Sequence, residues 1–197
     1  SAVSLALFLH LGTAVSATVY YRSTISAVVI SMVKQWQGEA ATAPALFYFV
    51  ATLVSGLVGI GCYALLQEVV SALTGGTVVI SIGLLLITMG VFQRVSTENE
   101  SVSSPEPAVG DAILVGVAQG VAILPGITRS GMTTGTLLLR GYEGSDAFRF
   151  SFVLSIPAAV GGGLIAAIDS GLQGFTPMQA LAAFLTAAVV GYLSMDV

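Results

Sequence analysis

The chain has 197 residues, of which only 8% are charged and 55% are hydrophobic, and its mean hydropathy is +0.96. A soluble domain carries about 25% charged residues, so this composition cannot cover a water-facing surface and indicates an integral membrane protein. The net charge of −4, in a sequence without a basic cluster, excludes nucleic-acid binding. The single cysteine excludes a disulfide framework and any metal site built from cysteines.

Five segments are long and apolar enough to cross a bilayer as helices. About 20 apolar residues span the hydrocarbon core. The segments of this length are residues 2–21, 45–66, 76–93, 150–168 and 178–195. We therefore expect an all-α integral membrane protein with five transmembrane helices.

A sixth apolar region, residues 111–139, is interrupted near its middle by Pro125-Gly126 and again by Gly131. Each half holds about 12–14 residues and would make roughly 20 Å of helix at 1.5 Å per residue. That length enters a ~30 Å hydrocarbon core without crossing it. The region predicts one re-entrant helical hairpin, in which two half-helices meet at a turn.

The basic residues distinguish a hairpin from a single crossing. With a hairpin, Arg22, Lys34, Arg94, Arg140 and Arg149 all fall on one side of the membrane, and the other side has no lysine or arginine. A single crossing would divide these five residues three to two. Cytoplasmic loops are enriched in lysine and arginine, so the hairpin is favoured and the basic side is predicted to be cytoplasmic.

Two shorter segments complete the predicted layout. Residues 23–37 carry an apolar stripe at helical spacing, which predicts a short helix on the cytoplasmic surface; a simple loop is the alternative. Residues 96–110 are polar, acidic and proline-containing, which predicts a linker. The expected organisation is a first repeat over residues 1–95, this linker, and a second repeat over 111–197.

A faint internal repeat underlies that division. Residues 8–14 (FLHLGTA) resemble residues 152–158 (FVLSIPA), and a hairpin precedes only the second copy. We expect a matching hairpin ahead of Ser1, so the chain is interpreted as a fragment. Three spans would separate the hairpins, and an odd number makes them enter from opposite sides, as in an inverted-topology repeat. The glycine run at 161–163 allows close helix packing within or between chains, which leaves a homodimer open.

The stretch most informative about function surrounds Arg129, at the predicted hairpin tip. A charged group deep in a membrane costs at least a few kcal/mol, so it needs a partner. No acid lies within residues 111–139 apart from Asp111 at the boundary. The partner is therefore an anionic ligand or an acid from elsewhere. In the alternative without a ligand, Arg129 in a helix break rich in serine and threonine extends to the membrane interface or pairs with a carboxylate such as Glu68 or Asp169.

The residues around Arg129 favour a phosphate ligand. Glycines allow backbone N–H groups to approach a ligand, and hydroxyls supply further donors. The second half-helix is expected to begin near Ser130, so its N-terminal dipole points at the tip. A guanidinium binds phosphate through two parallel hydrogen bonds. The expected ligand groups beside Arg129 are Gly126, Thr128, Ser130, Gly131, Thr133 and Thr134. Gln119 either lines the same cavity or forms an inter-helix hydrogen bond.

Residues 125–133, PGITRSGMT, resemble the PGxSRSxxT motif of undecaprenyl pyrophosphate phosphatases of the bacitracin-resistance type. The AQG before this motif, the LRG after it, and the segments FLHLGT at 8–13 and AFRFSF at 147–152 also resemble that family. The resemblance covers nearly the whole chain and is most specific over residues 110–160. The family usually has serine where this chain has Thr128, which keeps the hydroxyl.

The resemblance implies a multi-pass enzyme of the plasma membrane that hydrolyses a polyprenyl diphosphate to the monophosphate and inorganic phosphate. This reaction recycles the lipid carrier for peptidoglycan and other glycan assembly. By the resemblance, Arg129 binds the diphosphate, and hydroxyls such as those of Thr128 and Ser130 hold or attack phosphorus.

A second family motif, with two glutamates and a serine-containing segment, is absent from this sequence and is expected before Ser1. The resemblance implies that its glutamates hold a divalent metal, Mg²⁺ or Ca²⁺. Residues 1–197 alone are therefore expected to be inactive. His10 lies inside the first span and is not the family's histidine.

A transporter or flippase of anionic lipids is the alternative function. Inverted repeats with broken helices also form transporter sites, and a fold alone does not determine function. A purely structural membrane subunit, with Arg129 paired to an acid, is a third alternative.

Overall fold

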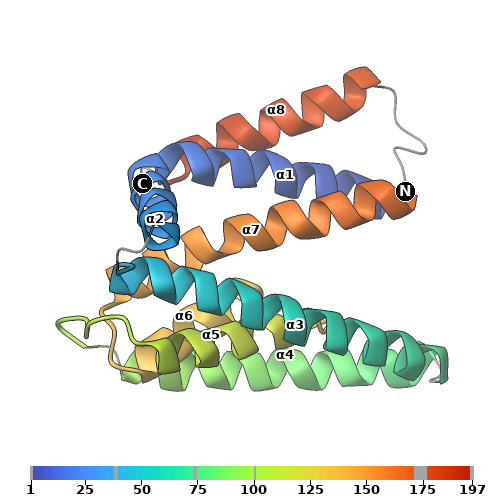
Figure 1. Cartoon of the computed structure of the whole chain (residues 1–197). Coiled ribbons are helices and arrows are strands. Elements are labelled where there is room, and N and C mark those ends of the chain that lie inside the picture. Colours follow the sequence, from blue (N-terminus) through green and yellow to red (C-terminus); the bar gives the residue numbers. More distant parts are fainter. Residues whose placement is uncertain (1, 38–39, 73–74, 100, 171–176, 196–197) are drawn as a thin grey trace. The chain divides into compact units, whose positions relative to one another are not determined.

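The computed structural model describes all residues except 1, 38–39, 73–74, 100, 171–176 and 196–197. In this part of the chain every regular element is an α-helix, which confirms the all-α prediction (Figure 1). The helices are α1 (Ala2–Tyr20), α2 (Arg22–Trp36), α3 (Ala43–Ala72), α4 (Gly75–Glu98), α5 (Val109–Val121), α6 (Arg129–Leu139), α7 (Gly144–Ser170) and α8 (Pro177–Leu193).

The five segments predicted to cross a membrane coincide closely with α1, α3, α4, α7 and α8, and the predicted short helix at 23–37 coincides closely with α2. Among the described residues, two helical segments are long and apolar enough to span a membrane, Ala43–Leu66 and Gly75–Glu98. Several helices extend beyond the apolar segments; α4 continues to Glu98 and α5 begins at Val109, so both ends of the predicted linker at 96–110 are helical. Hydropathy marks where apolar side chains end, whereas helical backbone hydrogen bonds continue into polar residues.

The described residues form two compact units. The α1–α8 unit comprises Ser1–Ala27 and Phe152–Val197, and the hairpin unit comprises Val28–Ser151. These units follow contacts between helices, whereas the predicted repeats follow similarity along the sequence. The division into two repeats stays a prediction.

In the α1–α8 unit, the two helices pack through small residues. A Cβ atom on Gly12 would lie 2.9 Å from the Cβ of Ala187, which is closer than real side chains approach. Ser16 donates a hydrogen bond to the carbonyl of Ala188 across the same contact. Small residues and hydroxyl cross-links are common where helices associate in lipid, because lipid tails are as apolar as leucine.

The hairpin unit is built around α5 and α6, which lie between α3 and α4 (Figure 1). A Cβ on Gly116 would lie 2.8 Å from the carbonyl oxygen of Ala51, and a Cβ on Gly120 would lie 2.6 Å from the Cβ of Val58. The residue numbers of these contacts increase in the same direction along the two helices, so α3 and α5 run parallel. Only glycine allows this close approach.

The helix α6 packs along α4 in the same way. A Cβ on Gly131 would collide with the side chains of Gln93 and Thr128, and a Cβ on Gly135 would collide with Phe92. The predicted second interruption at Gly131 is wrong, because this residue lies inside α6. Its missing side chain instead allows α6 to approach α4.

The turn between α5 and α6 lies beside the apolar interior of α4. A Cβ on Gly126 would lie 2.9 Å from the carbonyl oxygen of Ile82 and 3.1 Å from the Cβ of Leu85. Ile82 is seven residues after the first residue of α4, Gly75, which is roughly 10 Å of helix. The two predicted helices on either side of the Pro125-Gly126 break are present as α5 and α6, and their turn stops short of the far end of α4. The re-entrant placement of this hairpin in a membrane stays a prediction.

Candidate anion-binding site

The turn at the hairpin tip is formed by Leu124-Pro125-Gly126-Ile127. The N–H of Ile127 donates to the carbonyl of Leu124 at 3.1 Å, and Gly126 has a φ of +96°. Proline fixes φ near −65° at the second position, and a positive φ at the third position makes this a type II turn, where glycine is favoured. The interruption predicted at Pro125-Gly126 is confirmed, and α6 begins two residues after this turn.

Replacing Gly126 by alanine is expected to destabilise the tip through two separate effects. A side chain at positive φ costs about 1–2 kcal/mol, and the new Cβ would lie 2.9 Å from the carbonyl of Ile82. Gly141→Ala is the matched control, because Gly141 has a φ of +81° but no atom within 4 Å of its Cβ position. Thermal unfolding of the full-length protein in detergent should show a larger loss for Gly126→Ala. Equal losses would contradict the tight contact with α4.

The first turn of α6 presents backbone donors. Thr128 is the N-cap residue, yet its side chain makes no capping hydrogen bond, and its Oγ1 accepts one from Gln93 Nε2 at 3.4 Å. The first N–H groups of any helix have no partner within that helix. Among the described residues, nothing accepts from the amides of Arg129, Ser130 and Gly131. These amides and the positive end of the helix dipole are available to an anion.

The Arg129 side chain is half-buried. Within the described part of the chain, ion pairs join Arg94 to Glu98 and Arg140 to Asp111, and none involves Arg129. Its guanidinium also makes no hydrogen bond to any described residue. The alternative in which Arg129 pairs with Glu68 is therefore not observed, and the side chains of Asp169 and His10 lie outside the described ones.

Gln119 is buried in α5, away from open solvent. Its Nε2 donates to the hydroxyl of Ser55 on α3 at 3.0 Å. The inter-helix hydrogen bond that the sequence left open is thus present. Its Oε1 atom is buried without a partner among the described residues.

Thr133 and Thr134 are also buried, one turn inside α6. The hydroxyl of Thr133 lies 2.5 Å from that of Ser151 on α7, whereas Thr134 Oγ1 has no partner among the described residues. The structure therefore separates the predicted ligand residues into two groups. The tip group is Gly126, Thr128, Arg129, Ser130 and Gly131, and the enclosed group is Gln119, Thr133 and Thr134.

The open end of the hairpin is closed by a cluster around Asp111, at the start of α5. Arg140 Nε donates to Asp111 Oδ1 at 2.6 Å, and the hydroxyl of Tyr142 donates to Oδ2 at 3.1 Å. Burial of Tyr142 and the negative charge of Asp111 raise the pKa of Tyr142, which keeps its hydroxyl protonated as a donor. The cluster fixes the two half-helices to each other at the end opposite the tip.

Sequence reasoning missed the polar partners Ser55, Gln93 and Ser151, because isolated hydroxyls and amides on apolar helices carry no signal of what they meet. The pairing of Asp111 with Arg140 did have a signal. These residues lie 14 positions before and 15 positions after Pro125, so an antiparallel hairpin brings them together.

The tip group does not suit a divalent cation. Mg²⁺ and Ca²⁺ prefer carboxylate and carbonyl oxygens, whereas the tip supplies a guanidinium, hydroxyls and N–H groups. Among the described side chains, no three histidine, cysteine, aspartate or glutamate residues come together as a metal site. The arrangement is suited to an anion instead.

Over residues 1–197 the chain matches the protein family described as bacitracin resistance protein BacA. The chain belongs to this family. The resemblance found in the PGITRSGMT motif is confirmed, and in this family member the motif forms the hairpin turn and the first turn of α6.

Archaeal relatives of this chain carry the name undecaprenyl-diphosphatase. The protein of Haloarcula marismortui is 42% identical over 98% of this chain and 72% of its own length. That of Methanococcoides burtonii is 35% identical over 90% of this chain and 66% of its own length. That of Saccharolobus islandicus is 34% identical over 81% of this chain and 57% of its own length. The relatives are longer than the stretch that this chain matches.

Proposed function

We propose that the protein acts as a membrane phosphatase that hydrolyses undecaprenyl or another polyprenyl diphosphate to the monophosphate and inorganic phosphate. The observation that carries this proposal is the half-buried guanidinium of Arg129, without an ion pair among the described residues, at the uncapped N-terminus of α6. Relatives named undecaprenyl-diphosphatase support the substrate class. The reaction would recycle the lipid carrier of glycan assembly.

The membrane arrangement belongs to the same proposal. We place α1, α3, α4, α7 and α8 across the plasma membrane and the α5–α6 hairpin inside it as a re-entrant element. The contact of Gly126 with Ile82, inside the apolar stretch of α4, supports this depth for the tip. An unpaired cation at such a depth is costly, which a bound anion would offset.

The chemistry follows from the donors at the tip. Arg129 and the first amides of α6 would bind the terminal phosphoryl group and stabilise the charge on its equatorial oxygens as the bond breaks. An attacking oxygen, from water or from the exposed hydroxyl of Ser130 or Thr128, forms the new bond to the terminal phosphorus. The bond from that phosphorus to the bridging oxygen breaks, and the prenyl monophosphate leaves with the electron pair, while the proton of the attacking group passes to solvent. Where a side-chain hydroxyl attacks, a water molecule then hydrolyses the phosphoester and releases inorganic phosphate.

A divalent metal, Mg²⁺ or Ca²⁺, and a homodimer also remain proposals. No residue of the tip group would hold the metal, so its ligands are expected outside these residues. The glycine run proposed for close packing includes residues 162 and 163, whose surroundings lie outside the described ones. No catalytic step above depends on either proposal.

The decisive experiment supplies the full-length protein, reconstituted in vesicles, with a polyprenyl diphosphate and measures inorganic phosphate. Phosphate release with saturation in substrate is the expected result. Movement of labelled anionic lipid between leaflets without phosphate release would favour the transporter or flippase instead.

A further inference from the structure

Two buried hydroxyls connect the first turn of α6 to α7. The Oγ1 of Thr133 lies 2.5 Å from the Oγ of Ser151, and their exposed fractions are 0% and 3%. Thr133 follows Arg129 by one helical turn, so this contact lies directly behind the tip group. Ser151 was not among the site residues expected from the sequence.

The protons of this contact can be assigned from its acceptors. Thr133 Oγ1 also lies 3.0 Å from the carbonyl oxygen of Arg129 and 3.2 Å from that of Ser130. A carbonyl only accepts, and a hydroxyl has a single proton to donate. The arrangement that satisfies all these contacts has Ser151 donating to Thr133 and Thr133 donating to a carbonyl. The hydroxyl proton of Thr133 is then used inside the protein and is unavailable to a ligand.

Ser151 is itself held in place by its neighbour in α7. The ring of Phe150 packs against Phe47 of α3 with 4.9 Å between centroids, and against Tyr142 with 5.8 Å between centroids. Tyr142 in turn bonds to Asp111 at the open end of the hairpin. The Ser151 hydroxyl is thus presented from a rigid aromatic cluster rather than from a loop.

We propose that Ser151 is a positioning residue that acts through Thr133 to hold the first turn of α6, and that Thr133 is its partner rather than a phosphate ligand. This inference rests on the proposed function, because the groups being positioned are the guanidinium of Arg129 and the amides beside it. A small displacement of such groups is costly, since about 1 Å of misplacement can lower a rate ~100-fold.

The test compares Ser151→Ala, Thr133→Val and the double variant in the full-length protein, with phosphate release measured against substrate concentration. Each single change is expected to lower kcat about tenfold with little change in KM, because neither side chain touches substrate. The double variant should be no worse than Thr133→Val, since both changes break one contact. Thr133→Ser, which keeps the hydroxyl, should restore most of kcat.

Ser155→Ala and Thr136→Val are the matched controls. Among the described residues, Ser155 donates only to the carbonyl of Phe152 at 2.7 Å, and Thr136 only to that of Met132 at 2.7 Å, so each bonds within its own helix. Both controls should keep kcat within about twofold, because each removes only a hydrogen bond within one helix. A wild-type kcat in Ser151→Ala would overturn the proposal. So would a raised KM in Thr133→Val together with a double variant whose loss in kcat equals the product of the two single losses.

Two further measurements keep the result interpretable. Should Ser151→Ala fail to fold, Ser151→Cys preserves the size with a weaker donor and should give an intermediate kcat; a wild-type kcat would again count against the proposal. An inactive wild type would contradict the proposed function instead. The contact between Ser151 and Thr133 would then be tested by unfolding temperatures. A double variant whose loss equals the sum of the two single losses would reject the contact.

Discussion

Arg129→Ala should abolish phosphate release from a polyprenyl diphosphate while leaving the protein inserted and folded. The expected loss in kcat is at least ~1,000-fold, because a guanidinium that stabilises a transferring phosphoryl group is worth that much or more. The unfolding temperature should stay equal or rise, since an unpaired buried cation is removed. Phosphate release and thermal unfolding in detergent measure the two effects separately.

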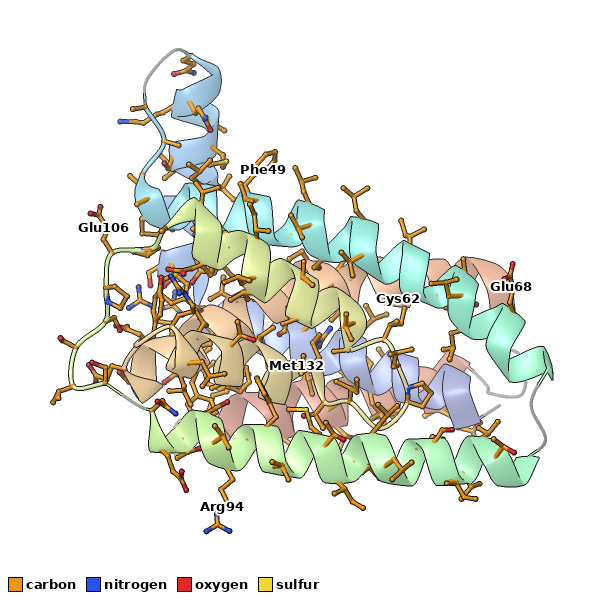
Figure 2. All side chains as sticks on the ribbon, turned by 90° about the horizontal axis from the view of Figure 1, so that it is seen from below. Phe49, Cys62, Glu68, Arg94, Glu106 and Met132 are labelled. Atoms are coloured by element: carbon orange, nitrogen blue, oxygen red, sulfur yellow. The ribbon has the colours of Figure 1, made fainter. Side chains whose placement is uncertain are left out.

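Two variants sharpen this prediction. Arg129→Lys keeps the charge but loses the two-pronged donor geometry, so its activity should lie between those of wild type and Arg129→Ala. Arg94→Ala is the control, because the Arg94 side chain is 85% exposed beside Glu98 and points away from α5 and α6 (Figure 2). It should retain activity within about twofold. Near-normal turnover of Arg129→Ala would remove the anion-site interpretation.

Gly116→Ala should destabilise the contact between α5 and α3 strongly. The added Cβ would lie 2.8 Å from the carbonyl oxygen of Ala51 and 2.8 Å from the Cβ of Val54. A backbone carbonyl cannot rotate away, so α5 must move from α3. We expect a loss of about 1–3 kcal/mol in the free energy of unfolding, with reduced activity because the shift reaches the tip.

Gly110→Ala is the matched control, because Gly110 lies in the same helix and its Cβ position has no atom within 4 Å. An alanine there should leave stability unchanged or raise it by up to ~1 kcal/mol through helix propensity. The difference between the two unfolding temperatures isolates the helix contact. Equal temperatures would show that α5 does not approach α3 as closely as the structure has it.

The sequence by itself determined the class of protein, the approximate positions of the helices and the segment proposed here as the site. Sixteen charged residues in 197 cannot cover a soluble surface, whatever the fold. The break at Pro125-Gly126 was predictable because proline and glycine act on the local backbone, and the structure has a turn there. The motif around Arg129 was found because a charge in an apolar segment is conspicuous without any knowledge of its neighbours.

Only the tertiary structure decided which of the candidate residues face the tip and which are enclosed. Thr128 and Thr133 look equivalent in the sequence, yet one is an exposed N-cap and the other bonds to Ser151, 18 positions away. Gln119 meets Ser55 at a separation of 64 positions. Gly131 was expected to interrupt a helix and instead lets α6 approach α4. Helical periodicity shows which residues share a face of a helix. The partner of that face depends on how separate helices pack, and hydropathy carries no information about this packing where every helix is apolar.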